Sequence, residues 1–263
     1  MKKEYILVID SGVGGLSILA KLYKLVPANF IYFADRKNCP YGKHKKHEIF
    51  NFLDNIIKEY TSKYNIKIVV LACNTATTTS IKNLRKKYKD LTFVGTEPAI
   101  KLASDAGFDK ILVLSTPATA KQNSFKKLKQ TAEHSGKVIK CLKLEFFAID
   151  IEKYFTQKSV LSWLALLKDL FFIKRKAKNF DCVVLGCTHY PLISNLIQKY
   201  VNKPLLSGSL GVSRRVFDMQ KNLNTKPFVA RSSVTFFSSA DFSLNQKYKK
   251  IFKQILANKQ NIW

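Results

Sequence analysis

Two cysteines stand at equivalent places in two similar stretches of the sequence. Val69 to Thr75 contains three apolar residues, a small residue, Cys73 and two polar residues, and Val183 to His189 repeats this pattern around Cys187. Such a pattern is typical of a buried strand that leads through a turn into a helix. A thiol at this kind of turn lies near backbone N–H groups and a positive helix N-terminus, which favour the thiolate. The sequence therefore predicts two reactive thiols in equivalent surroundings.

Two equivalent thiols favour a reaction that is itself nearly symmetric. Inversion of a carbon centre is one, because one group removes a proton from one face while the other supplies a proton to the opposite face. Each cysteine has a polar neighbour that could assist it: Asp10, at the end of the first apolar segment, for Cys73, and His189 for Cys187. Another interpretation stays open for each, since Asp10 could cap the following helix and His189 could be structural.

Other residues at predicted turns could hold a small anionic substrate. The Gly-rich segment Asp10 to Gly15 can bring backbone N–H groups close to an anion. It lacks the Lys-Ser/Thr pair of a P-loop, and Ser17 stands where a dinucleotide fingerprint needs its third glycine, so a carboxylate suits it better. Uncharged donors for a small amino acid are available in the segment Pro40-Tyr41-Gly42 and at Asn74, Thr75, Thr116, Thr119 and Thr188. Each of these could also serve ordinary turn chemistry.

The elements that must position these residues can be read from the spacing of apolar residues. Helical periodicity follows the first glycine-rich turn and recurs from Ile49 to Tyr60. Short apolar runs predict buried strands at residues 5–9, 66–72, 91–95, 110–114, 137–142 and 182–186. Alternation of this kind predicts an α/β fold with parallel sheets, whose carboxyl ends are where ligands bind.

A second internal repeat indicates two similar halves. Ile6 to Ser11 and Ile111 to Thr116 are both apolar runs that end in hydroxyl-bearing turns, and each precedes one of the two cysteine segments. We therefore predict two similar Rossmann-like, parallel-sheet domains facing a central cleft. The predicted boundaries are residues 1–97, completed by 208–263, for the N-terminal domain and residues 98–207 for the second domain.

The charge of the chain is unusual. Its 263 residues include 45 Lys and Arg but only 18 Asp and Glu, which gives a formal net charge of +27. The lysines are spread along the chain, and the densest runs, Lys43 to Lys46 and Lys174 to Lys178, lack the interleaved aromatic residues of a nucleic-acid platform. We expect solvated helix faces, no specific nucleic-acid partner, and attraction of an anionic substrate.

Targeting and redox features of the sequence point to the cytoplasm. The first apolar segment ends after five residues, at Asp10, so no export signal is expected. The most apolar window, Leu161 to Ile173, is interrupted by Lys168 and Asp169 and is too short to span a bilayer. We expect no membrane partner. An odd number of widely spaced cysteines (39, 73, 141, 182 and 187) predicts free thiols rather than a disulfide framework.

The motifs taken together resemble those of bacterial glutamate racemase, in the aspartate/glutamate racemase superfamily, in their order and spacing. The two cysteine motifs are the most specific, and the likeness covers most of the chain. The matching segments are Asp10 to Ser17, Pro40 to Gly42, Ala72 to Ala76, Glu97 to Lys101, Gly186 to Pro191 and Arg214 to Val216.

This resemblance implies an isomerase that interconverts L- and D-glutamate and supplies D-glutamate for peptidoglycan. It implies two Rossmann-like domains, no metal and no pyridoxal phosphate, with Cys73 acting on D-glutamate and Cys187 on L-glutamate. By the same likeness, Glu152 contacts the amino group, although the divergent segment Ala148 to Glu152 leaves Asp150 as an alternative. The substrate-binding residues implied are Ser11, Tyr41, Gly42, Asn74, Thr75, Thr119 and Thr188, and we also expect Asp10 and His189 to contact the substrate.

Some departures and rival interpretations stay open. Ser207 stands where the family usually has an acidic residue, which leaves the subunit contacts and the effector response undefined, and a homodimer is one open assembly. A racemase of the same superfamily acting on aspartate or a hydantoin is the nearest alternative. A zinc site of Asp10, Cys73, Cys187 and His189 is disfavoured by the absence of CxxC and HxxxH spacing. A basic nucleic-acid-binding protein is the third alternative.

Overall fold

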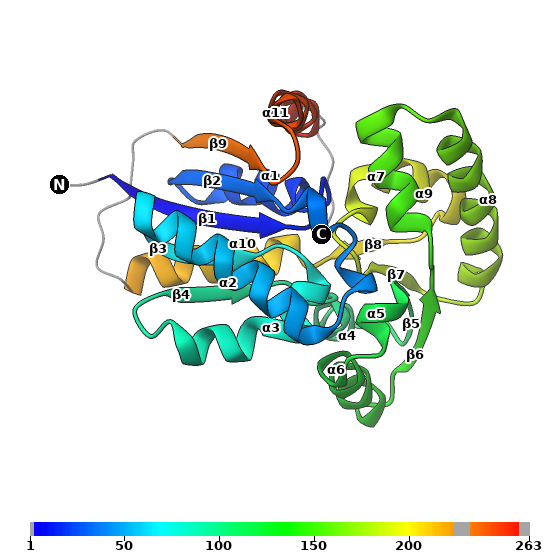
Figure 1. Cartoon of the computed structure of the whole chain (residues 1–263). Helices are drawn as coiled ribbons and strands as arrows, with labels where there is room; N and C mark the ends of the chain where they lie inside the picture. The colour runs from blue at the N-terminus through cyan, green and yellow to red at the C-terminus, as the bar shows by residue number, and fades with distance from the viewer. Residues whose placement is uncertain (1–2, 223–231, 258–263) are drawn as a thin grey trace. The chain divides into compact units, whose positions relative to one another are not determined.

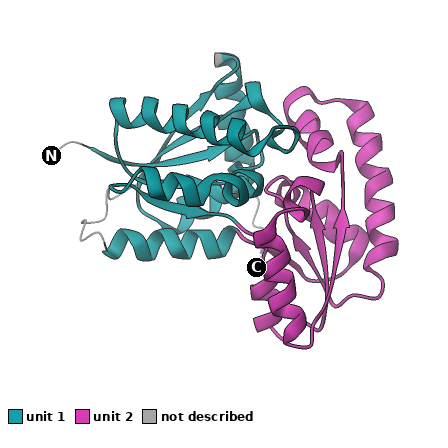
Figure 2. Cartoon of the chain, turned by 60° about the horizontal axis from the view of Figure 1, so that its bottom comes forward, with its two compact units in different colours: residues 1–96, 209–257 teal, residues 97–208, 258–263 magenta. Residues whose placement is uncertain are grey.

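The computed structural model describes residues 3–222 and 232–257. The chain divides into two units, which are coloured separately in Figure 2. Unit 1 contains residues from Met1–Thr96 and Ser209–Ala257, and unit 2 contains Glu97–Gly208. Residues 223–231 and 258–263 of the predicted C-terminal completion lie outside the described residues. Among the described helices, none is long and apolar enough to cross a membrane.

Unit 1 is built on a five-stranded parallel sheet with strand order β4-β3-β1-β2-β9 (Figure 1). Its strands are β1 (Glu4–Asp10), β2 (Asn29–Ala34), β3 (Asn65–Leu71), β4 (Thr92–Gly95) and β9 (Ser233–Ser238). Its helices are α1 (Leu16–Leu25), α2 (Lys46–Lys63), α3 (Asn74–Lys87), α10 (Ser209–Asn222) and α11 (Phe242–Ala257), with short 3₁₀ turns η1 (Arg36–Asn38) and η2 (Tyr41–Lys43). Helix α2 contacts α3, while α1 contacts α10 and α11.

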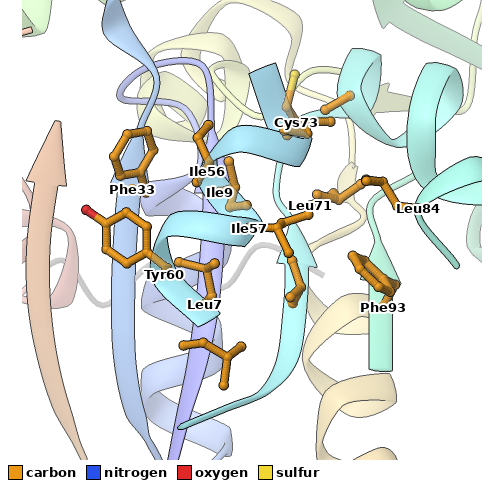
Figure 3. Close-up of a cluster of buried hydrophobic side chains, with 14 of the residues drawn as sticks. Leu7, Ile9, Phe33, Ile56, Ile57, Tyr60, Leu71, Cys73, Leu84 and Phe93 are labelled. Atoms are coloured by element: carbon orange, nitrogen blue, oxygen red, sulfur yellow. The ribbon is translucent and has the colours of Figure 1, made fainter. Parts of the chain in front are cut away.

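One hydrophobic cluster joins the sheet of unit 1 to α2 and α3. Alternate residues of β1, Leu7 and Ile9, pack there with Leu71 of β3 and with the apolar side of α2. Figure 3 shows Cys73 at the edge of this cluster, with its sulfur directed away from the other labelled side chains. The intervening residues of β1 are buried too. Burial of both faces explains why these strands read as continuous apolar runs.

Unit 2 is built on a four-stranded parallel sheet with strand order β6-β5-β7-β8. Its strands are β5 (Lys110–Ser115), β6 (Val138–Lys143), β7 (Cys182–Leu185) and β8 (Leu205–Ser207). Its helices are α4 (Ile100–Asp105), α5 (Pro117–Ala120), α6 (Asn123–His134), α7 (Phe147–Gln157), α8 (Val160–Ala177) and α9 (Ser194–Val201), with a 3₁₀ turn η3 (Tyr190–Ile193). Leu112 and Val183 face a cluster formed with α7, α8 and α9, and Ile111 and Val184 face one formed with α4 and α6.

The two sheets share one topology. If β1, β2, β3 and β4 are matched with β5, β6, β7 and β8, the order 2-1-3-4 describes both sheets. The same backbone contacts follow: Ala72 donates its N–H to Ile9 in unit 1, and Gly186 donates to Leu114 in unit 2, both at 2.8 Å. The internal repeat seen in the sequence therefore corresponds to a repeat of sheet topology.

The predicted fold class of two similar parallel-sheet α/β domains is confirmed. The six predicted strands are present, and each end differs from the prediction by at most one residue. Three further strands were missed, β2, β8 and β9. Strand β8 has only three residues, and β9 lies at the sheet edge, where Phe236 is its one buried residue, so neither gives a strong periodic signal.

Gly186 is required by the close approach of β7 to the end of β5. A Cβ atom at Gly186 would lie 2.6 Å from the backbone oxygen of Leu114, which cannot move without displacing the strand. We expect Gly186→Ala to lower the free energy of unfolding by about 1–3 kcal/mol, as overpacking commonly does. Urea denaturation measures the change.

Gly211→Ala is the matched control, because a Cβ atom at Gly211 in α10 meets nothing within 4 Å. Alanine also has the higher helix propensity, so this variant is expected to be no less stable than the parent chain. Equal stability of the Gly186→Ala and Gly211→Ala variants would contradict the steric argument.

Candidate active site

Cys73 lies at the turn between β3 and α3. It has extended backbone angles and occupies the N-cap position, so Asn74 and Thr75 form the first turn of the helix. Its carbonyl oxygen accepts a hydrogen bond from the Thr77 N–H at 2.9 Å. Only 8% of Cys73 is exposed. The thiol therefore stands at a helix N-terminus, where the partial positive charge of the backbone favours an anion.

Asp10 ends β1, the strand next to β3. Its Oδ1 atom accepts a hydrogen bond from the Gly12 N–H at 2.8 Å. The N-cap position of α1 is occupied by Gly15. A Cβ atom at Gly15 would lie 2.6 Å from the Cβ of Asp10 and 3.1 Å from that of Ala72. Glycine here lets the turn pack directly against both strand ends.

The segment that carries Pro40, Tyr41 and Gly42 is held by a buried carboxylate. The hydroxyl group of Tyr41 donates to Asp35 Oδ2 at 2.8 Å, and the side-chain amide of Asn38 donates to both Asp35 oxygens. Burial raises the pKa of Tyr41 well above its usual value, and the charges of Asp35, Cys73 and Asp10 raise it further. Tyr41 is therefore a neutral donor that lies within electrostatic range of Cys73 and Asp10.

These residues gather where the strand order of the sheet reverses. Strand β2 lies on one side of β1 and β3 on the other, so the carboxyl ends of β1 and β3 flank the switch point. Asp10 and Ser11 follow β1, and Cys73 follows β3. Open parallel sheets bind ligands at this position. In unit 2 the corresponding place lies between β5 and β7, which lead to Thr116 and Cys187.

Cys187 in unit 2 is joined to two buried side chains. Its sulfur lies 3.8 Å from Nδ1 of His189, and Nε2 of the same ring lies 2.8 Å from Oε2 of Glu152 on α7. His189 and Glu152 are both buried, whereas Cys187 is partly exposed. The three residues form a connected Cys-His-Glu arrangement through which a proton can pass to and from the sulfur.

The pKa of His189 is raised well above its usual value. Burial by itself lowers the pKa, but hydrogen bonds to Cys187 and Glu152 outweigh burial, and the negative charges of both partners add to them. An imidazolium at this position can donate from both ring nitrogens. His189 is therefore held in the charged form over a wider pH range than an exposed histidine.

The predicted hydroxyl donors of unit 2 fall at the ends of the same strands. Thr116 caps the short helix α5, with its Oγ1 atom accepting from the Thr119 N–H at 3.3 Å and donating to the Thr119 hydroxyl at 3.2 Å. Thr188 is buried between Cys187 and His189 in the turn after β7. Thr119 is buried as well.

The sequence did not decide whether Glu152 or Asp150 belongs to the site. Glu152 is the one that contacts His189. Asp150, two residues earlier on α7, lies near Ser162 and Lys153 instead, and burial raises its pKa. Asp35 is a site residue that the sequence analysis missed. The sequence feature that could have identified it is its position directly after the apolar run Phe30 to Ala34, which was not predicted to be a strand.

No group of three or more His, Cys, Asp and Glu residues within residues 3–222 and 232–257 could hold a metal ion. The five cysteines, all of which lie in the described part of the chain, are free thiols, as expected.

Comparison with known proteins decides the family. The model of the Asp/Glu/hydantoin racemase family matches residues 32–210. The chain belongs to this family. Similar relatives include a glutamate racemase from Clostridium novyi, 37% identical over 94% of this chain and 95% of the relative, and one from Clostridium botulinum, 35% identical over 88% and 89%.

A solved structure agrees with the sequence comparison. The glutamate racemase of Escherichia coli, in complex with L-glutamate and the activator UDP-MurNAc-Ala, has a TM-score of 0.82 and 27% identity, over 96% of this chain and 95% of that one. The resemblance found in the sequence and the assignment to the amino-acid racemases are thereby confirmed.

In this racemase, Glu152 is expected to maintain the raised pKa of His189. Glu152→Gln should lower that pKa, because the amide carries no negative charge to stabilise the imidazolium. The folded-state pKa lies above the unfolded value of about 6.5, so the contact stabilises the fold below that pH and loses its contribution as pH rises through the folded-state pKa. The variant should therefore lose more stability at pH 6 than in alkaline solution.

Histidine NMR titration and urea denaturation measure both effects. Asp150→Asn is the matched control, because it removes a carboxylate from the same helix without removing a contact to His189. A His189 pKa that is the same in the Glu152→Gln variant and the parent chain would refute the electrostatic account.

Proposed function

We propose that this chain interconverts L- and D-glutamate by proton transfer at the α-carbon between two thiols, Cys73 and Cys187, and needs neither a metal nor pyridoxal phosphate. The observation that carries the proposal is that each parallel sheet presents one of these cysteines at the same topological position, after β3 and after β7. The names of the relatives and the L-glutamate bound to the Escherichia coli enzyme support the choice of glutamate.

Inversion by this route requires the two thiols to reach opposite faces of one α-carbon. In the L-to-D direction the Cys187 thiolate removes the α-proton, and the electron pair of the C–H bond moves toward the carboxylate. The Cys73 thiol then delivers its proton to the other face, which leaves a Cys73 thiolate and a Cys187 thiol. The D-to-L direction starts from that state, so each cysteine is a base in one direction and an acid in the other.

Different groups assist the two thiols. His189 lies 3.8 Å from the Cys187 sulfur, is oriented by Glu152, and can exchange a proton with that sulfur. Asp10 ends the strand beside β3 and is the corresponding group for Cys73. Glu152 is thus assigned a positioning role on His189 rather than direct contact with the substrate amino group.

The substrate carboxylates are assigned to uncharged donors. In unit 1 these are Ser11, the Pro40-Tyr41-Gly42 segment, Asn74 and Thr75, which follow the carboxyl ends of β1, β2 and β3. In unit 2 they are Thr116, Thr119 and Thr188. Fixed donors of this kind stabilise the negative charge that grows on the α-carboxylate as the proton leaves. From the family resemblance we further propose that the D-glutamate made in the cytoplasm supplies peptidoglycan synthesis.

Replacement of either cysteine is expected to abolish racemisation. Cys73→Ser and Cys187→Ser should each lower kcat/KM about 100- to 10,000-fold in both directions, since every turnover needs one base and one acid. Chiral chromatography after incubation with L- or D-glutamate, and with aspartate as the rival substrate, measures the rates. Cys141→Ser, which changes a partly buried thiol on β6, is the control and should retain activity. A Cys73 or Cys187 variant that keeps more than about a tenth of the activity would contradict the assignment of these two thiols as acid and base.

The origin of the delivered proton provides an independent test. In deuterium oxide, early turnover of L-glutamate should give D-glutamate with deuterium at the α-carbon, because the donating thiol has already exchanged with solvent. Unconverted L-glutamate should stay protiated. Mass spectrometry of each separated enantiomer at low conversion makes the measurement. Substantial protium in the product would indicate a single base that carries the original proton between faces, contrary to the two-thiol route.

A further inference from the structure

Helix α8 exposes an apolar surface that no other described helix matches. The exposed fractions are 71% for Val160, 79% for Leu161, 56% for Leu164, 58% for Phe171 and 39% for Phe172. The remaining exposed residues of the helix are all basic: Lys168, Lys174, Arg175 and Lys176. The α8 face, meaning these nine residues, thus contains neither an acidic nor a neutral polar side chain.

Comparison with α2 shows that this composition is not a general property of the chain. Helix α2 also has 18 residues and also covers a sheet. Its exposed residues are Lys46, His47, Asn51, Asn55, Lys58, Glu59, Ser62 and Lys63, all of them polar. The exposed residues of α8 therefore differ in composition from those of another helix of the same length in the same chain.

The apolar residues of the α8 face form one continuous stripe. At 100° per residue, the five lie within an arc of about 120°, which is one side of the helix. Lys168 and Arg175 fall inside the same arc, and Lys176 Nζ lies 5.3 Å from the centre of the Phe172 ring. With 18 residues, the helix is about 27 Å long. Buried contacts with α7 and α9 hold its opposite side in unit 2 (Figure 1).

We propose that the α8 face binds reversibly to the surface of an anionic lipid bilayer. A helix with Leu and Phe on one side and Lys and Arg interspersed lies in the interface, with its apolar side chains among the acyl chains and its basic groups at the lipid phosphates. Lys168 and Arg175 can extend their long side chains to the headgroups while their methylene groups stay in apolar surroundings. The net charge of +27 adds long-range attraction to an anionic surface.

Charge complementarity favours an anionic bilayer, rather than a second copy of the chain, as the partner of the α8 face. Every charge on the α8 face is positive, so a copy of the same face offers no opposite charge. Lys168 stands near the middle of α8, and a two-fold pairing about the helix centre would bring two such side chains together. The proposal departs from the sequence-based expectation of no membrane partner, which treated the lysines as evenly solvated.

Vesicle binding tests the proposal directly. The full chain is incubated with vesicles of phosphatidylglycerol and phosphatidylcholine, or of phosphatidylcholine alone, and bound protein is separated by centrifugation. We expect binding only to the vesicles that contain phosphatidylglycerol, with weaker binding at high salt. The double variant Leu161→Gln/Phe171→Gln should bind at least about tenfold more weakly, because less apolar surface enters the bilayer.

Matched controls separate the α8 face from general hydrophobicity and charge. Leu102→Gln/Val138→Gln changes two exposed apolar residues outside α8 and should leave binding unchanged. Lys168→Glu/Arg175→Glu should weaken binding far more than Lys126→Glu/Lys127→Glu on α6, although both alter the net charge equally. Thermal melting establishes that each variant is folded.

Three results would overturn the proposal. The first is that the chain binds both kinds of vesicle equally or binds neither. The second is that the α8 variants and their controls lose the same amount of vesicle binding. The third is that the chain forms a dimer in analytical ultracentrifugation and that Leu161→Gln/Phe171→Gln dissociates it. The last result would assign the α8 face to a second copy of the chain.

Discussion

The pairing of β1 with β3, and of β5 with β7, is the constraint on which the rest of the site depends. The backbone N–H of the residue before each cysteine donates to the neighbouring strand, from Ala72 to Ile9 and from Gly186 to Leu114, at 2.8 Å. These hydrogen bonds extend the parallel ladders to the last residue before each turn. They fix each thiol beside the end of the adjacent strand, and in unit 2 the approach is so close that a Cβ atom at Gly186 would lie 2.6 Å from the Leu114 oxygen.

Similar backbones carry different side chains beside the two cysteines. In unit 1 the strand beside the cysteine ends in Asp10, whose carboxylate accepts from the Gly12 N–H. In unit 2 the equivalent strand ends in Ser115, and the proposed acid-base role falls to His189, whose ring contacts Glu152 of α7. The difference matches the proposed reaction. Both thiols transfer a proton at the same α-carbon, but they approach the two different faces of a chiral substrate.

Much of the fold could be predicted from the sequence because both faces of each sheet are buried, so strands such as Val69 to Leu71 read as uninterrupted apolar runs. The turns after them could be predicted because glycine and polar residues follow directly. The contact of Glu152 with His189 could not, since it joins residues 37 positions apart through the packing of α7 against the turn after β7. Asp35 was missed because its strand, β2, was missed, although its role depends on hydrogen bonds to Asn38 and Tyr41 only a few residues away.

Unit 1 is assembled from both ends of the chain, and this has a consequence for biosynthesis. Strand β9 pairs with β2, and α10 and α11 pack on α1, so the N-terminal sheet keeps β2 as an open edge until the last part of the chain has left the ribosome. The described residues of unit 2 lie in one uninterrupted segment, Glu97–Gly208. We therefore expect the middle of the chain to reach its native packing during translation, and the N-terminal strands to be the part most in need of protection from aggregation until β9 has been synthesised.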